Sequence, residues 1–396
     1  MFLLQALGSN GSGQLGLGHK EDVDTPQPVI LPAPLSRNST PHTEHDIRPI
    51  RIAAGGNHTL LLLSSGDLLW TGDASTGACG PASPPSDHVG EPTPSFRPVD
   101  LTSPPLPPSG RFKIRHIAAT WSASIVVLTS DDDDDNDDSS EEGEDRVYAF
   151  GSGAKGELGL GQGTLRTSEP MPIPDFPPRG ARVVDLAACM GHVVAVLSNG
   201  EAWGWGNGRK GQLGEPAMGA VWSPRRIGIE GGGAGTQFKV VKAVCGREFT
   251  CLFGHPETGE MIVLGSDKWG VRSEAPDKGS LAGWREVGAG WGSVYVLKED
   301  GRLLGWGRDD HGQLARSEDL GRVTQMAVGS EHALAWTESG DLMAWGWGEH
   351  GNCGPVRSDD GKKGQHNRIV SGGLGLEITM LGAGCATSWI AIKKPR

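Results

Sequence analysis

The sequence predicts an all-β fold, a seven-bladed β-propeller closed by its N- and C-terminal strands in one shared blade. Three observations predict it: a recurring glycine pattern, a recurring strand–turn–strand motif, and two terminal fragments that complete each other. Self-similarity at a fixed longer period is typical of repeat architectures, and four short antiparallel strands per unit describe a propeller blade. We therefore expect residues 1–396 to form a single propeller domain.

The glycine pattern is an anchor glycine followed by further glycines five and eight positions later. Five copies are complete, and two keep only the glycine at the fifth position. The chain has 62 glycines, and this periodic placement is explained better by turns than by disorder. The complete copies begin at Gly8, Gly72, Gly151, Gly206 and Gly346, and the weaker copies begin at Gly265 and Gly307.

A second motif, which precedes most anchors, is an apolar run, a turn of small residues and another apolar run. A tight turn such as Asn199-Gly200 or Asp300-Gly301 comes next, and its glycine supplies the positive φ that a two-residue hairpin needs. A third strand then ends at the anchor, and a weak fourth strand is expected in each variable connector. The seven copies span 51–63, 116–128, 185–197, 242–253, 286–297, 325–336 and 380–392.

The two ends of the chain are complementary halves of one unit. The chain begins with a third strand and a glycine loop, "FLLQALGSNGSGQLGLG", and it closes with the first two strands, "ITMLGAGCATSWIAIKK". Joined, they complete a seventh blade and remove exposed sheet edges. The opening "MFLLQALG" is accordingly expected to be a strand of the ring rather than a leader.

The net charge of −12 is concentrated in one segment. Asp131–Asp145 holds 11 acidic residues and no basic one, so the rest of the chain has 37 acidic against 36 basic residues. The segment replaces a two-residue hairpin turn, and its like charges repel one another. We expect a disordered acidic loop, residues 131–145, inserted in one blade, and we prefer a solubilising role to a site for a basic partner.

Several function classes are disfavoured. No apolar run approaches the 18 residues that a membrane span needs. The six cysteines form no C-x-x-C pair and are scattered over different units, so we expect free thiols in a reducing compartment, no metal site and no cofactor. The near-neutral body and the acidic loop also disfavour direct nucleic-acid binding.

An enzymatic function is not predicted. His58, His192 and His332 occupy one equivalent repeat position, which indicates a structural role, such as a bond to a backbone group in the same blade, rather than catalysis. The stretch "GSGQLGLG" lacks the lysine that a phosphate-binding loop requires. No catalytic residues are therefore assigned.

The repeat pattern "AxGxxH…L…G.L..WG.G..GQLG" resembles the regulator-of-chromosome-condensation propeller repeat over nearly the whole chain. Within that family, "ALGSNGSGQLGLGHKEDVDTPQ", "AWGWGEHGNCGP" and "GCATSWI" resemble the subgroup of fungal alpha-tubulin suppressors, also called killer-toxin-insensitivity proteins. "WGWGEHGNCGP" is the most specific of these signals. The connectors and the acidic insertion do not contribute to this resemblance.

The resemblance implies a protein-binding scaffold that forms a heterodimer with a small CSL-type zinc protein of diphthamide synthesis. The pair supports diphthamide formation on elongation factor 2 and, through Elongator, wobble-uridine modification of transfer RNA, and its zinc belongs to the partner. A cytoplasmic location is implied, with the nucleus left open. The alternative is a guanine-nucleotide exchange factor for a Ran-like small GTPase.

The predicted binding face is the end of the ring that collects the first-to-second turns and the glycine loops. Trp121 and Trp291 stand out because the equivalent turns otherwise hold small or polar residues, and packing against a neighbouring blade is the alternative explanation for each. Tryptophan and arginine are over-represented at interface hot spots. Trp291 and His311 belong to one unit and are expected to approach each other. The candidate partner-binding residues are Trp291, His311, Trp121, Trp269, Arg247, Glu248, Asp309, Asp310, Glu331, Glu349 and His350.

Overall fold

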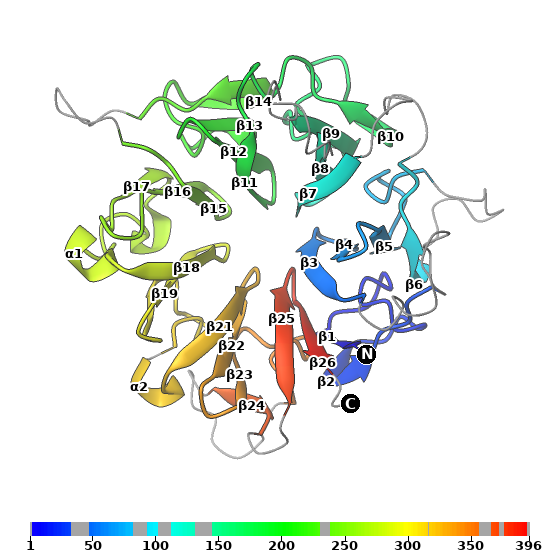
Figure 1. Ribbon diagram of the computed structural model, residues 1–396, viewed down its shortest axis with the longest axis vertical. Coiled ribbons are helices and arrows are strands. Elements are labelled where there is room, and N and C mark those ends of the chain that lie inside the picture. Colours follow the sequence, from blue (N-terminus) through cyan, green and yellow to red (C-terminus); the bar gives the residue numbers. More distant parts are fainter. Residues whose placement is uncertain are drawn as a thin grey trace, which may run out of the picture.

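The computed structural model describes residues 2–32, 47–81, 93–101, 112–130, 145–229, 238–315, 317–355, 366–371 and 376–393. These residues form seven antiparallel sheets arranged as blades around a central axis (Figure 1), which confirms the predicted seven-bladed propeller. None of the helices among them is long and apolar enough to cross a membrane.

The blades are numbered here from the first complete one, and in blades 1 to 6 the strands run outward from the axis in chain order (Figure 1). Blade 1 contains β3 (Pro49–Ala54), β4 (His58–Leu63), β5 (Leu68–Gly72) and β6 (Thr93–Pro98). Blade 2 contains β7 (Phe112–Ala119), β8 (Ala123–Ser130), β9 (Asp145–Ser152) and β10 (Arg166–Pro172). Blade 3 contains β11 (Val183–Cys189), β12 (His192–Leu197), β13 (Ala202–Gly208) and β14 (Met218–Arg226).

The second half of the ring follows the same order. Blade 4 contains β15 (Lys242–Cys245), β16 (Phe249–Phe253) and β17 (Met261–Gly265). Blade 5 contains β18 (Trp284–Ala289), β19 (Ser293–Lys298) and β20 (Leu303–Gly307). Blade 6 contains β21 (Val323–Val328), β22 (His332–Thr337), β23 (Leu342–Gly346) and β24 (Asn367–Val370). Blade 7 joins β25 (Glu377–Ala383) and β26 (Thr387–Lys393) to β1 (Phe2–Gly8) and β2 (Val23–Pro28).

Blade 7 closes the ring as the terminal fragments predict. Strand β1 pairs with β26 in an unbroken antiparallel register from Phe2 opposite Lys393 to Gly8 opposite Thr387. Both chain ends therefore lie at the same blade (Figure 1). The pairing buries Trp389 and Ile390 completely, so each end of the chain supplies part of the core that the other needs.

The expectation of a fourth strand in every unit is wrong for blades 4 and 5, whose described residues form three-stranded sheets. Their connectors hold short helical turns instead: η2 (Lys268–Gly270), α1 (Lys278–Leu281) and α2 (Ser317–Leu320). Val271, which comes directly after η2, is fully buried, and its carbonyl accepts a bond from the Trp306 indole at 2.9 Å. A packed connector thus fills space where the other blades place a strand.

The anchor glycines are required because their positive φ brings the backbone against the preceding turn. Gly8 has a φ of 116°, and a Cβ there would lie 2.3 Å from the carbonyl oxygen of Ala386. Gly346 has a φ of 106°, and its Cβ would lie 2.4 Å from the carbonyl oxygen of Glu331. A side chain at either position would push apart the turn and the glycine loop, which form one end of each blade.

The repeated histidines join neighbouring blades rather than bonding a backbone group in their own blade, so that part of the prediction is wrong. Their Nε2 atoms share hydrogen bonds with hydroxyl groups on the second strand of the next blade. Burial lowers the pKa of all three histidines to about 4, so they are neutral at pH 7. The pairs are His58 with Ser124 at 3.0 Å, His192 with Thr250 at 3.0 Å and His332 with Ser388 at 2.9 Å.

The acidic segment falls largely outside the described residues, which resume at Asp145. Asp145 itself is not part of a loop, because it begins β9 and its side chain is buried. Its carboxylate accepts a bond from the Thr129 hydroxyl at 2.7 Å and from the Val183 backbone N–H at 2.6 Å. Asp145 therefore links blades 2 and 3, and its place in the predicted loop is corrected.

Candidate functional site

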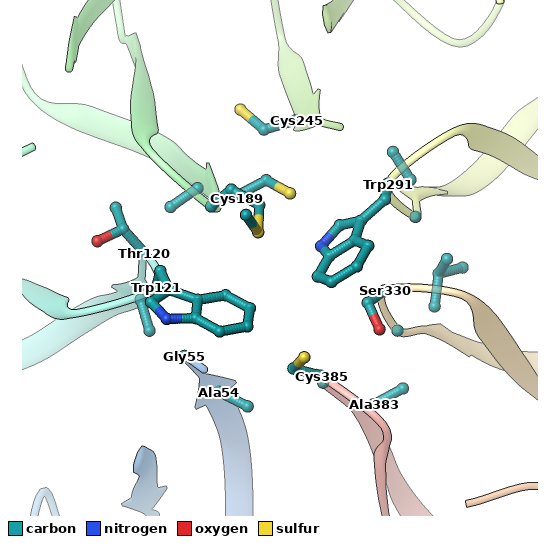
Figure 2. Close-up of a pocket in the computed structure, with 18 residues that line it drawn as sticks. Ala54, Gly55, Thr120, Trp121, Cys189, Cys245, Trp291, Ser330, Ala383 and Cys385 are labelled. Carbon is teal, nitrogen blue, oxygen red and sulfur yellow. The ribbon is translucent and has the colours of Figure 1, made fainter. Parts of the chain in front are cut away.

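The first-to-second turns of all seven blades meet around the axis of the ring. They line a small central cavity of about 110 Å³ (Figure 2), built mostly from alanine, glycine, serine and cysteine. The indole rings of Trp121 and Trp291 project into it from blades 2 and 5, with centroids 6.2 Å apart and planes tilted by 41°. The two tryptophans that the sequence singles out therefore lie beside each other rather than in separate blade cores.

Backbone hydrogen bonds between successive turns hold these indoles in place. Gly56 N–H donates to the Trp121 carbonyl at 2.9 Å, and Trp121 N–H donates to the Met190 carbonyl at 2.7 Å. On the other side, Trp291 N–H donates to the Ser330 carbonyl at 2.6 Å. A Cβ at Gly56 would lie 2.5 Å from the Trp121 ring, so the absence of a side chain there makes room for the indole.

Three cysteines contribute to the lining of the cavity, namely Cys189, Cys245 and Cys385 (Figure 2). Burial raises the pKa of Cys189 to about 12 and that of Cys245 well above its ordinary value, and the pKa of Cys385 is raised for the same reason. These thiols are therefore protonated at pH 7 and are poor nucleophiles. No group of three or more metal-ligating side chains suited to an ion occurs in the described part of the chain.

Beside the cavity lies a more polar cleft of about 320 Å³ between blades 4, 5 and 6, here called the cation cleft. Arg247, Glu248, Lys268, Trp269, Trp291, Arg308 and Glu331 contribute to its lining. The Arg247 guanidinium lies 5.6 Å from the Trp291 ring, and the Lys268 ammonium and Arg308 guanidinium lie 4.9 and 5.0 Å from the Trp269 ring. Cations at these distances are attracted to the ring faces.

Trp269 is held in a conformation that tryptophan rarely adopts. Its φ is 71°, and its side chain is 41% exposed. Positive φ does not occur at the equivalent position of the other units, which hold Ser12, Thr76, Lys155, Lys210, His311 and His350. A bulky residue in the left-handed region is strained, and such strain clusters at functional sites.

The floor of the cation cleft is a network centred on Arg308. Its Nε and Nη2 donate to the two oxygens of Asp310 at 2.6 and 2.9 Å, and its Nη1 donates to Glu331. The amide of Gln313 donates to Glu331 at 2.9 Å. Hydrogen bonds from Arg308 lower the pKa of Asp310, whereas burial raises the pKa of Glu331 against the opposing effect of Gln313 and Arg308.

His311 lies against a residue outside the predicted set. Its ring stacks on Trp347 of blade 6, with centroids 4.2 Å apart and planes tilted by 15°, while Trp291 of its own unit pairs with Trp121. Trp347 is 38% exposed. A signal for it exists in the sequence, because the residue directly after the anchor is polar in every other unit: Ser9, Asp73, Ser152, Asn207, Ser266 and Arg308.

The remaining predicted residues lie around this centre. Asp309 is exposed, and its carboxylate accepts the backbone N–H of Leu314 at 2.9 Å. Glu349 is exposed, and His350 Nδ1 lies within hydrogen-bond distance, 2.8 Å, of a carboxylate oxygen of Asp22 in blade 7. The structure thus brings Arg247, Glu248, Trp269, Trp291 and Glu331 together in one cleft, whereas the contact of His350 is at the closure of the ring.

Comparison with known proteins places the chain in a family. The model of the RCC1-like domain matches residues 4–390. An RCC1 repeat-containing protein of Schizosaccharomyces pombe is 31% identical, with 99% of each chain covered. The secretion-regulating guanine nucleotide exchange factor of Mus musculus is 28% identical, with 89% of this chain and 75% of the relative covered.

Among solved structures, Prp20p of Saccharomyces cerevisiae superposes with a TM-score of 0.74 at 21% identity, covering 100% of this chain and 92% of the other. At that identity the likeness shows the fold alone. The repeats, the closed ring of seven blades and the match of the family model over nearly the whole sequence agree with one another. The chain belongs to the RCC1-like domain family.

Proposed function

We propose that this protein is a non-enzymatic scaffold that forms a heterodimer with a small CSL-type zinc protein. The RCC1-like propeller is a fold that serves protein interaction. The observation on which the proposal rests is the convergence of Trp121, Trp291 and Trp269 with Arg247 at one end of the ring. Trp121 and Trp269 are each 41% exposed, far more than core packing requires.

Exposed tryptophans backed by fixed backbone are the usual anchors of protein interfaces. Tryptophan and arginine are enriched among the few residues that dominate binding energy. A standard interface buries about 1,600 Å² in total, which a small partner domain can supply. Because the turns are tied to one another by backbone hydrogen bonds, the indoles are preorganised and binding needs little ordering of the scaffold.

The choice of partner rests on the resemblance of "AWGWGEHGNCGP" and the two terminal stretches to the fungal tubulin-suppressor subgroup. With that partner, the scaffold would act in diphthamide synthesis on elongation factor 2 and in Elongator-dependent wobble-uridine modification of transfer RNA. This role needs no metal or cofactor in the propeller, because the zinc belongs to the partner. We place the activity in the cytoplasm, with the nucleus as a second location.

An exchange factor for a Ran-like small GTPase is the second candidate. It is favoured by the likeness to the mouse protein that is named as a guanine nucleotide exchange factor. The two candidates differ in their binding partner and in the consequence of binding. A scaffold forms a stable stoichiometric complex, whereas an exchange factor accelerates release of bound nucleotide.

One experiment separates the two candidates. The purified propeller is mixed in turn with the small CSL-type zinc protein and with a Ran-type GTPase loaded with a fluorescent guanine nucleotide. We expect a complex of one propeller and one zinc protein by light scattering after size exclusion, and an unchanged rate of nucleotide release. Accelerated release without a complex with the zinc protein would reverse the assignment.

A further inference from the structure

The cation cleft differs in charge from the protein that contains it. Its lining includes Arg247, Lys268 and Arg308 against Glu248 and Glu331, and the Asp310 carboxylate is bound to Arg308, so three positive groups are balanced by three negative ones. The chain as a whole has a net charge of −12. A locally neutral cleft on an acidic protein repels an anionic ligand group less than the rest of the surface does.

The three cations do not have the same freedom to bind. The guanidinium donors of Arg308 already have partners within the protein, because Asp310 accepts from two of its nitrogens and Glu331 from a third. Within the described ranges, the contacts of the charged groups of Arg247 and Lys268 are with the faces of Trp291 and Trp269. These two cations therefore remain open to a carboxylate.

Stacking on an indole does not occupy the hydrogen-bond donors of a guanidinium. The donors lie in the guanidinium plane and point to its edges, so Arg247 can stay on Trp291 while it binds a carboxylate bidentately. Lys268 supplies a second charge from the Trp269 side of the cleft. The two indoles give the cleft apolar walls for the stem of the acidic residue or for its neighbour.

We propose that the cation cleft binds an acidic peptide segment of the protein partner, with glutamate or aspartate carboxylates on Arg247 and Lys268 and an adjacent apolar side chain between Trp269 and Trp291. The proposal deepens the proposed function, since it rests on the same binding face. A peptide fits better than a nucleic acid. Glu248 in the lining can accept a peptide N–H group, and the two glutamates of the lining repel a continuous phosphodiester backbone, which presents no donor.

The test uses the full chain and two capped peptides, acetyl-Gly-Glu-Leu-Glu-Gly-amide and its matched form with glutamine in place of both glutamates. Binding is followed by tryptophan fluorescence. We expect saturable binding of the acidic peptide, with the glutamine form about tenfold weaker because two partly exposed ion pairs are lost. The double variant R247Q/K268Q should bind both peptides equally. The matched control is Lys210→Gln, an exposed lysine of the blade 3 glycine loop, which should keep the preference.

Three results would overturn the proposal: no saturable binding of the acidic peptide at millimolar concentration, no preference over the glutamine form, or tighter binding of a short oligouridylate. Circular dichroism verifies that each variant is folded. A parallel titration of the wild-type chain with the CSL-type zinc protein tests the heterodimer separately from the peptide site. If the wild-type chain does not bind that protein, the proposed heterodimer is contradicted. The comparison of the two peptides tests the cleft independently of that result.

Discussion

Trp121 and Trp291 lie beside each other at the axis of the ring, with ring centroids 6.2 Å apart, although they belong to blades 2 and 5. Neither indole is packed into the core between adjacent blades. Their positions result from the closure of the ring, which brings the first turns of all seven blades to one cavity. An aromatic pair that is fixed by backbone and is partly open to solvent is suited to contact with a partner.

Replacement of one of these indoles should weaken the heterodimer strongly. Truncation of a central tryptophan at an interface costs about 2 kcal/mol or more, which is roughly a thirtyfold loss of affinity. We expect that loss for Trp291→Ala in calorimetric titration against the zinc protein. Glu338→Ala, in a hairpin turn at the opposite end of the ring, should bind like the wild type. A folded Trp291→Ala variant with unchanged affinity would remove this face from the interface.

Closure of blade 7 should be essential for stability. Deletion of residues 378–396 removes β26 and almost all of β25, and with them the fully buried side chains of Trp389 and Ile390. Burial of each such side chain contributes about 2–3 kcal/mol, and β1 would become an unpaired edge. We expect a lower melting temperature and association on size exclusion. A monomer that melts like the full chain would show that these ends do not hold the ring closed.

Asp145 should contribute to stability although it borders the acidic run. Asp145→Ala leaves the Val183 N–H without its partner, and loss of a buried bond to a charged group costs about 2 kcal/mol. Urea unfolding measures the change in the free energy of unfolding. Glu257→Gln, at a side chain that is 88% exposed, is the control and should be neutral. Equal stability of both variants would mean that the link between blades 2 and 3 is dispensable.

The buried histidines should make the protein less stable in acid. Because the pKa of His192 is lowered from 6.5 to about 4, the unfolded chain binds a proton at pH 5 that the folded chain does not. Stability is therefore complete above pH 6.5 and is lost as the pH falls toward 4, by about 2 kcal/mol per histidine at pH 5. His192→Gln should lose less stability than the wild type between pH 7 and pH 5 in urea titrations. Parallel losses would assign the acid sensitivity to other groups.

The sequence predicts the ring well because its strongest signals are local and repeated. An anchor such as Gly346 has a positive φ that favours glycine, and the terminal strands of blade 7 pair with each other in an unbroken register. The other features depend on contacts between residues that are far apart in the sequence. From the sequence Asp145 is one more charge of an acidic run, and only the structure shows that it bonds Val183 of the next blade. The sequence likewise does not show that the connector of blade 4 buries Val271 where other blades place a fourth strand.

The candidate site is predicted less completely than the ring. The sequence selects Trp121 and Trp291 as unusual turn residues, but their contact depends on which blades face each other across the axis. It pairs His311 with Trp291 because both belong to one unit, whereas the His311 ring stacks on Trp347 of the next blade. Neighbouring blades approach each other closely at the glycine loops, so membership of one unit is a poor guide to contact there.

Trp269 offers a test of whether a strained conformation serves binding. At an ordinary position glycine is less stable than alanine by about 0.5–1 kcal/mol, because glycine loses more backbone freedom on folding. Trp269 has a φ of 71°, where any residue with a Cβ is strained by about 1 kcal/mol or more. The strain of about 1–2 kcal/mol exceeds that disadvantage of glycine, so Trp269→Gly should be more stable than Trp269→Ala, by roughly half to one kcal/mol in urea unfolding.

Both Trp269 variants lose the ring that Lys268 and Arg308 contact, so both should bind the zinc protein about equally weakly. Trp269→Gly would then combine near wild-type stability with lost affinity, which is the expected signature of strain retained for function. If Trp269→Ala is the more stable variant, the left-handed conformation stores no strain. If Trp269→Gly binds the partner as tightly as the wild type, the indole lies outside the interface.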